Sequence, residues 1–159
     1  MNKQTLVKKI ITHLAGELAL YHKAARAAHA EATHEQSKAE NKYDTRGLEA
    51  SYLARGQSRQ AAEIEQAMQH FESLAVRAFR ANDPIDLSAL VELETTGGRA
   101  FYFIGPRAGG TEILHDHKEV MVITPPSPLG KQLMGRKQGD RWQIEFGGTR
   151  NVYRVVSVS

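Results

Sequence analysis

The sequence has 159 residues, of which 41% are hydrophobic and 25% are charged, and its formal net charge is +3. These proportions are those of an ordinary globular protein, and they exclude collagen-like, fibrous and wholly disordered chains. The absence of cysteine excludes disulfides, a thiol nucleophile and a zinc site built on thiolates. No apolar run approaches the length of a membrane span, and the N-terminus leads straight into an amphipathic pattern. We therefore expect no membrane segment, no signal peptide and a cytoplasmic location.

Composition divides the chain into two parts. All five prolines and ten of the thirteen glycines lie after residue 82, whereas the earlier part is rich in strong helix formers. Residues 1–82 carry twelve Lys or Arg and nine Asp or Glu, and residues 83–159 carry nine of each. The positive surplus therefore belongs to the first part. We expect two domains with these same boundaries.

The first part predicts a long antiparallel helical hairpin with a coiled-coil pattern. Apolar residues recur three and four apart within residues 3–33 and again within residues 40–80, which predicts one helix over each range. At 1.5 Å per residue, the first helix is about 45 Å long. Alanines near its middle allow the two helices to approach closely. The polar link between them, residues 34–40, is expected to be a solvent-exposed tip.

The second part predicts a small α+β domain with an antiparallel sheet. Short segments rich in β-branched and aromatic residues are separated by Gly and Pro, and their apolar residues alternate with polar ones. One short helix interrupts them, because Ser127 suits an N-cap, Pro128 the first helical position and Gly135 the C-terminal stop. Strands are expected at residues 90–94, 100–104, 119–123, 141–146 and 151–158.

One segment of the second part resembles a known family. Residues 127–140 carry Ser-Pro-Leu-Gly-Lys, then Leu, then Gly-x-x-x-Gly-Asp, and a strand, a Gly-Gly turn and a closing strand follow. This order is similar to the C-terminal domain of the Gre transcript-cleavage factors. The resemblance covers residues 86–159 and extends to the hairpin in architecture. It implies an FKBP-like fold for the C-terminal domain.

The resemblance also implies a function. Gre factors bind bacterial RNA polymerase with the C-terminal domain at the rim of the secondary channel and the hairpin inside it. Acidic residues at the hairpin tip help to hold a second magnesium ion beside the catalytic one, and the polymerase hydrolyses its own backtracked transcript. The factor is thus an accessory and not an enzyme. By this resemblance, Ser127, Pro128 and Leu129 are candidates for polymerase contact. We expect a monomer in the bound form, no stable independent binding of nucleic acid, and no cofactor besides the shared Mg²⁺.

The tip decides which Gre-like activity is expected. The family's tip reads Asp-x-x-Glu-Asn-Ala-(Glu/Asp)-Tyr, whereas this chain has Ser37 in place of the leading acid and its tyrosine one position early. The tip candidates by resemblance are Glu35, Glu40, Asn41, Tyr43 and Asp44. Two variants stay open. Either Glu40, with Glu35 or Asp44, assists transcript cleavage by contributing to the shared Mg²⁺ site, or the hairpin only occludes the channel and inhibits.

These signals also have structural interpretations. Ser37 and Glu40 match a capping box that starts the second helix. The segment His115-Asp116-His117 indicates a surface turn rather than a metal site, because no third ligand is evident nearby. An interaction module, in which the hairpin serves another protein partner or self-association, is the alternative function. The aromatic residues expected in the core, with an aromatic-lined isomerase pocket as the alternative, are Phe101, Phe103, Trp142 and Phe146.

Overall fold

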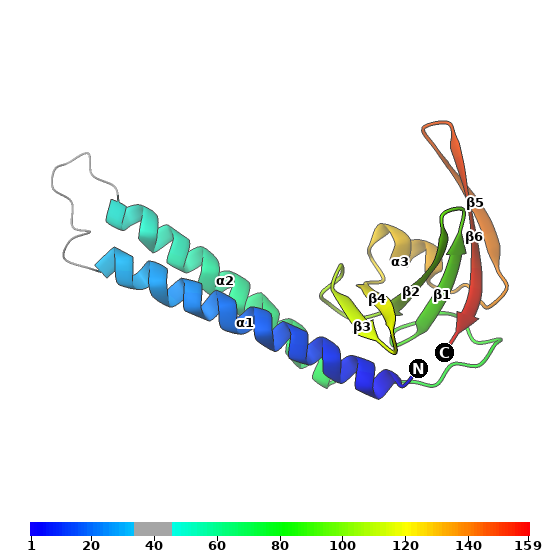
Figure 1. The fold of residues 1–159 in the computed structure, drawn as a ribbon, viewed down its shortest axis with the longest axis horizontal. Coiled ribbons are helices and arrows are strands. Elements are labelled where there is room, and N and C mark those ends of the chain that lie inside the picture. The colour runs from blue at the N-terminus through cyan, green and yellow to red at the C-terminus, as the bar shows by residue number, and fades with distance from the viewer. Residues whose placement is uncertain (34–45) are drawn as a thin grey trace. The chain divides into compact units, whose positions relative to one another are not determined.

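The computed structural model describes residues 1–33 and 46–159 (Figure 1). It divides into two compact units, one of residues 12–69 and one of residues 1–11 together with 70–159. Helices followed by a sheet with one further helix confirm the predicted α+β class, while the domain boundary at residues 82 and 83 stays a prediction. The elements in chain order are α1 (Lys3–Thr33), α2 (Arg46–Glu72), β1 (Leu90–Thr95), β2 (Gly98–Ile104), β3 (Glu112–His115), β4 (Lys118–Ile123), α3 (Pro128–Leu133), β5 (Arg141–Phe146) and β6 (Thr149–Val158).

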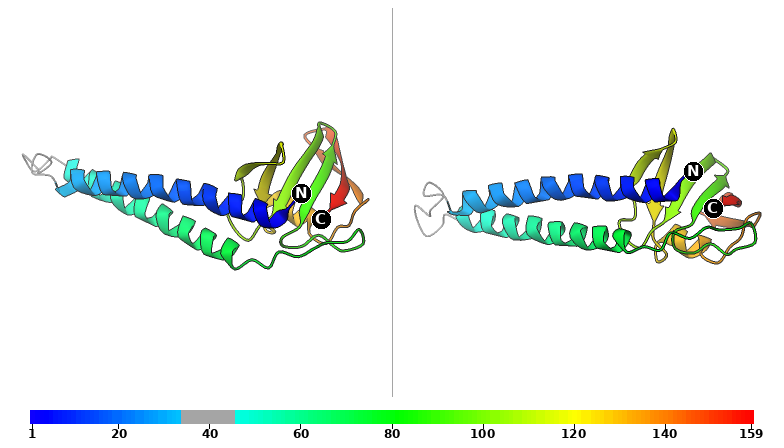
Figure 2. Two further views of the ribbon diagram at one scale, coloured as in Figure 1. Left: turned by 60° about the horizontal axis from the view of Figure 1, so that its bottom comes forward. Right: turned by 90° about the horizontal axis from the view of Figure 1, so that it is seen from below.

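The first unit is a two-helix arm, a name used below for the described residues within 12–69. Its two helices run side by side in opposite directions (Figure 2). The buried hydrophobic side chains of the arm are mostly small, namely Leu14, Ala28, Ala61 and Ala67. His22 and Glu65 link the helices, with 3.4 Å between Nε2 and Oε1. Because small residues occupy the interface, the two helices form a thin rod rather than a globular core.

Helix α1 begins where the sequence predicts. The Asn2 side chain accepts a hydrogen bond from the Thr5 N–H at 3.1 Å, and the Asn2 carbonyl accepts one from the Leu6 N–H, also at 3.1 Å. Asparagine is among the preferred N-cap residues because its side chain satisfies an otherwise unpaired helical donor.

Within the described part of the chain, no helix has a stretch long and apolar enough to cross a membrane.

Helix α2 ends earlier than its apolar spacing predicts. It stops at Glu72 rather than near residue 80, and its predicted start at residue 40 lies outside the described residues. Beyond it, the Arg77 N–H donates to Ser88 Oγ at 2.9 Å, and Phe79 is buried in the core of the second unit. An extended segment lets Phe79 reach this core, so tertiary packing overrides the helical preference of residues 73–80.

The second unit contains a six-stranded sheet in the order β3-β4-β2-β1-β6-β5. Four of its five pairings are antiparallel, but β2 and β4 are parallel, with Phe103 opposite Val122. The predicted antiparallel sheet is therefore wrong in this one pairing. Strand β4 forms a hairpin with β3 at the sheet edge, and this brings β4 beside β2 in the same direction.

The five predicted strands are present, each within two residues of its expected ends. Strand β3 was not expected. It has only four residues, of which Ile113 and His115 are buried and Glu112 and Leu114 are exposed. Four residues give too short an alternation to stand out in the sequence.

Both faces of the sheet bury apolar side chains. Helix α3 covers one face (Figure 1), where a single core cluster contains Phe79, Ile85, Ala89, Val91, Leu93, Ile104, Ile123, Leu133, Val155 and Val158. On the other face Gly105 lies against Phe71 and Val122, so closely that an added Cβ would come within 2.9 Å of each side chain. The buried residues of this second face and of the helix ends are Leu6, Val7, Ile10, Phe71, Leu90, Phe103, Ile113, Val120 and Val122.

Candidate functional site

The predicted contact residues lie at the start of α3. Ser127 is the N-cap: its Oγ accepts a hydrogen bond from the Gly130 N–H at 3.1 Å and donates one to the Thr124 carbonyl at 2.6 Å. Pro128 follows as the first helical residue and is exposed, while Leu129 is half-buried against the core. The Ser127 hydroxyl thus has one donor and one acceptor partner within the domain. All three predicted residues keep accessible surface: Pro128 is exposed, and Ser127 and Leu129 are partly buried.

The glycines of residues 127–140 have specific backbone roles. A Cβ on Gly130 would lie 1.9 Å from the Thr124 carbonyl oxygen, so only glycine fits. Gly135 and Gly139 have φ of 82° and 91°, which L side chains rarely adopt. Asp140 Oδ2 accepts a hydrogen bond from the Lys137 N–H at 2.8 Å. The motif therefore encodes a fixed helix and turn that start at Ser127.

An aromatic and cationic stack follows this helix, and the sequence did not predict it. Trp142 and Tyr153, directly opposite each other on β5 and β6, stack with 5.3 Å between ring centroids and 13° between planes. The Arg136 guanidinium lies 3.9 Å from the Trp142 centroid. Gln132 of α3 fixes both: its side-chain oxygen accepts from Trp142 Nε1 at 3.3 Å, and its carbonyl accepts from Arg136 Nε at 2.6 Å.

Part of this stack was open to prediction. Gly147 and Gly148 have φ of 59° and 80°, the conformation of a two-residue hairpin turn. Such a turn fixes the register that places Trp142 opposite Tyr153. The position of Arg136 depends on the turn after α3, which has no comparable signal in the sequence.

On the same core face, burial and the nearby Tyr153 raise the pKa of the Tyr102 hydroxyl.

The predicted aromatic core is confirmed only in part. Phe103 is fully buried, whereas Phe101 and Trp142 are partly exposed. Phe101 lies under the Lys118 ammonium, which is 5.1 Å from the ring centroid. The Phe146 side chain lies outside the described residues.

The predicted tip residues cannot be placed. Glu35, Glu40, Asn41, Tyr43 and Asp44 all lie outside the described residues. The helices that carry this segment end at Thr33 and begin again at Arg46.

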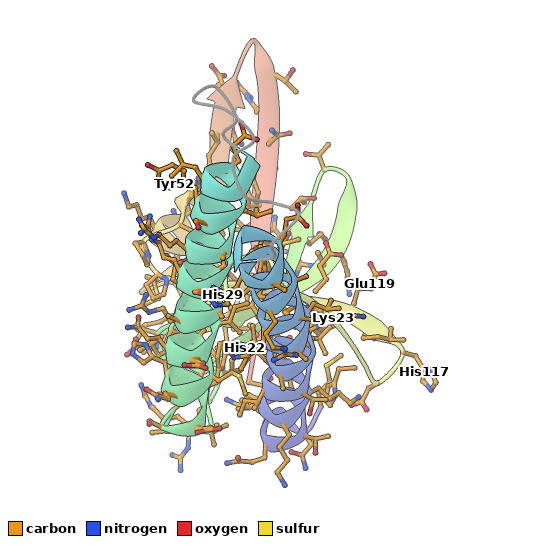
Figure 3. All side chains as sticks on the ribbon, turned by 90° about the vertical axis from the view of Figure 1, so that its left-hand side faces the viewer. His22, Lys23, His29, Tyr52, His117 and Glu119 are labelled. Carbon is orange, nitrogen blue, oxygen red and sulfur yellow. The ribbon has the colours of Figure 1, made fainter. Side chains whose placement is uncertain are left out.

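The arm carries a groove between its helices. Figure 3 labels His22 and His29 on the side of α1 that faces α2, and Tyr52 on the side of α2 that faces away from α1. The lining is basic and polar over small alanines, with side chains from both helices: His22, Ala25, Arg26, His29, Ala30, Ser51, Ala54, Arg55 and Ser58.

The predicted surface turn at His115-Asp116-His117 is confirmed only for Asp116 and His117, because His115 is the buried last residue of β3. Asp116 and His117 have φ of 50° and 62°, and His117 projects from the tip between β3 and β4 (Figure 3). The His115 side chain is 2% exposed, and neither ring nitrogen has a hydrogen-bond partner. Within residues 1–33 and 46–159, no three His, Asp or Glu side chains gather as metal ligands would.

The N-terminus of the chain is fixed by one lysine. Lys3 Nζ donates to the carbonyl oxygens of Ser88 and Ser159, each at 2.9 Å, and also to that of Arg77. It lies 4.7 Å from the centroid of the Phe79 ring. Burial, with a smaller effect of Arg77, lowers the pKa of Lys3 to about 8. One ammonium group thus joins α1, the extended segment and the C-terminus.

A network of charged side chains crosses β1, β2 and β6. Glu94 accepts hydrogen bonds from Arg154 at 3.2 Å and from Arg99 at 3.0 Å, and these bonds hold the pKa of its carboxyl below the ordinary value. Arg99 also lies 3.5 Å from Glu92. These cations are therefore neutralised within the sheet, unlike Arg136.

The chain is similar to solved structures of transcription factors. It shares 22% identity with GreA factor homolog 1 (Gfh1) of Thermus thermophilus, with 94% of each chain covered and a TM-score of 0.36. It shares 26% identity with Gfh1 of Thermus aquaticus, with 92% of each chain covered and a TM-score of 0.38. For elongation factor GreA/GreB of Nitrosomonas europaea, the identity is 16%, covering 70% of this chain and 92% of that one, with a TM-score of 0.33.

These are the same group of proteins that residues 127–140 resemble in sequence. No protein-family model matches the chain, and no curated protein matches it.

Proposed function

We propose that this chain is a Gre-like factor that binds RNA polymerase through its sheet-containing unit and inserts the arm into the secondary channel to modulate elongation. Two features support the proposal. Residues 127–140 carry the Gre-like motif on a rigid helix and turn, and the arm is a two-helix rod. The chain acts as an accessory, and any RNA cleavage takes place in the polymerase active site.

The thinness of the arm is the observation that carries the proposal. A helix with its side chains is about 10–12 Å across, and small residues at the interface draw two such helices together. The buried alanines 28, 61 and 67 serve this purpose. A rod of this kind buries too little apolar surface to be a stable core for its own sake, so its form suits a narrow space in a partner.

The tip then works near the polymerase active centre. In one form of the proposal, Glu40 contributes a carboxylate oxygen to a magnesium ion shared with the polymerase, with Glu35 or Asp44 assisting. Magnesium prefers such hard oxygen ligands. In the other form, the arm fills the channel and inhibits, and Ser37 in place of the family's leading acid supports this form.

Competition for core RNA polymerase tests the proposal. The labelled chain is expected to bind the polymerase, and an authentic Gre factor is expected to displace it completely, because both occupy the secondary channel. Binding that the Gre factor does not displace would contradict the proposal, as would the absence of binding.

A second candidate is an interaction module for another protein. The arm exposes four large apolar side chains, Leu20, Leu48, Tyr52 and Leu53, each more than half exposed. Such side chains are common at protein interfaces. The same competition separates the candidates, because a module for another partner does not compete with a Gre factor.

A further inference from the structure

We infer that Arg136, held on Trp142, is the specificity-determining residue of the docking surface and takes a carboxylate of the partner protein. The inference rests on the proposed function, since the partner is the polymerase. It adds a residue and a chemical class of ligand to the contacts predicted at the start of α3.

The first argument is preorganisation. The Arg136 guanidinium lies 3.9 Å from the centre of the Trp142 ring, and its Nε donates to the Gln132 carbonyl at 2.6 Å. Trp142 is in turn stacked on Tyr153 and hydrogen-bonded to the Gln132 side chain. Arginine normally loses much side-chain entropy when it binds a ligand. Here the folded domain has already restricted it, which favours tight binding.

The second argument is the unused hydrogen-bonding capacity of Arg136. Its two terminal Nη groups make no hydrogen bond or ion pair with any residue in the described part of the chain. This distinguishes Arg136 from Arg99 and Arg154, which both pair with Glu94, with Glu92 also beside Arg99. A planar fork of free N–H donors matches a carboxylate in a bidentate geometry.

The third argument is the kind of surface around Arg136. Lys137, next to Arg136 in sequence, is exposed, as is Lys131 of α3, while Asp140 caps the Lys137 N–H. Asp86 follows Ile85, whose N–H donates to the Arg136 carbonyl, but its carboxylate is paired with Arg77 at 3.4 Å. The surface is thus complementary to an acidic partner. Trp, Tyr and Arg are the residues most enriched at the energetic centres of protein interfaces, and here all three form one stack.

These features favour a protein carboxylate over a nucleic-acid phosphate. Proteins that follow a phosphate backbone use a row of cations and gain from the release of many counterions. The Arg136 guanidinium is instead fixed on Trp142, which, like Leu129 and Met134, packs half-buried against the apolar core. That arrangement suits one desolvated carboxylate at the centre of a protein interface.

The test measures affinity of the full chain for core RNA polymerase free of nucleic acid. Arg136→Gln is expected to weaken binding by about tenfold or more. Arg136→Lys keeps the charge but loses the planar fork, so its affinity should be intermediate. The matched control is Arg150→Gln, which removes the same charge from an exposed arginine that pairs with Glu145 at 3.3 Å. The control is expected to bind within about twofold of the wild type.

The outcomes separate this inference from the proposed function. If the wild type binds and Arg136→Gln binds equally well, or if both glutamine variants lose the same affinity, the inference is wrong and the proposed function stands. If Arg136→Gln loses affinity only for polymerase that carries nucleic acid, the ligand of Arg136 is a phosphate, and the assignment of a carboxylate is wrong. A wild type that does not bind overturns both. If Arg136→Gln does not fold, Arg136→Lys is compared with the wild type instead. Its thermal unfolding must be unchanged for this comparison of affinities to be valid.

Discussion

Among the described glycines, Gly130 has the least room for a side chain. An added Cβ would lie 1.9 Å from the Thr124 carbonyl oxygen and 2.8 Å from Ser127 Oγ, and backbone cannot move aside cheaply. Gly130→Ala is therefore expected to lower the free energy of unfolding by about 1–3 kcal/mol, the usual cost of overpacking. Urea unfolding followed by the fluorescence of Trp142, the one tryptophan, measures this cost in the unit that contains α3.

The matched control is Gly56→Ala in α2. Apart from its chain neighbours and the backbone of its own helix, nothing lies within 4 Å of the added Cβ there. Alanine in a helix interior is favoured over glycine by about 0.5–1 kcal/mol. The same substitution should thus have opposite signs at the two positions, with unfolding of the Gly56 variant followed by helical circular dichroism because Trp142 lies in the other unit. Equal effects would mean that the contact between Gly130 and Thr124 does not restrict the helix.

Lys3 gives the fold a pH dependence. Its pKa is about 8 in the folded chain against the ordinary 10.5, so between these values the unfolded chain binds more protons. Stability conferred by this residue should therefore rise as the pH increases from 8 to 10.5, and be lost as the pH falls through 8. We expect the wild type to gain stability relative to Lys3→Met over this range, as urea midpoints at several pH values would measure.

The hydrogen bonds of Lys3 act in the opposite direction. Carbonyl oxygens of Arg77, Ser88 and Ser159 favour the charged ammonium, whereas burial and the Arg77 charge disfavour it. If the urea midpoints of the wild type and of Lys3→Met change in parallel from pH 8 to 10.5, the hydrogen bonds and the burial of Lys3 cancel in their effect on its pKa. A gain toward lower pH would mean that the carbonyl oxygens dominate.

At the scale of elements, the sequence correctly predicted those helix ends and turns that depend on residues close together in the chain. The bounds of α1 follow from apolar spacing and the capped start of α3 from the Ser-Pro pair, and each is observed where it was expected. The two-residue glycine turn similarly fixes the β5–β6 register. These features depend on residues that are close in sequence, so one sequence suffices to find them.

Features determined by distant contacts were missed. Residues 73–80 have helical spacing but are extended, because Phe79 and the Arg77 N–H find partners in the sheet unit. The parallel pairing of β2 with β4 is equally invisible in an alternating pattern, which identifies a strand but not its direction. Arg136 belongs to the same class, because its contact with Trp142 depends on how the turn through Gly135 and Gly139 closes.

At the scale of the whole molecule, the two units divide the work of the proposed function. The sheet unit fixes the Gre-like motif and the Arg136 stack on one rigid framework. The arm supplies length with little apolar core. Binding and activity are therefore separable: variants of the docking surface should change affinity, and variants of the tip should change what the bound factor does.

Glu40 tests this separation. If the tip assists cleavage, Glu40→Ala should reduce stimulated cleavage of a backtracked transcript by at least about tenfold, the loss that even an outer partner of a metal ligand causes. Its affinity for the polymerase should be unchanged, because the docking surface is intact. The control is Glu49→Ala, which removes a nearby acid of α2 outside the tip motif and should leave stimulated cleavage at the wild-type level. A Glu40→Ala variant that stimulates cleavage fully would refute the assignment. If the wild type binds, slows elongation and stimulates no cleavage, the result would favour the form of the proposal in which the arm occludes the channel. In that form, Ser37 stands where the family has its leading acid.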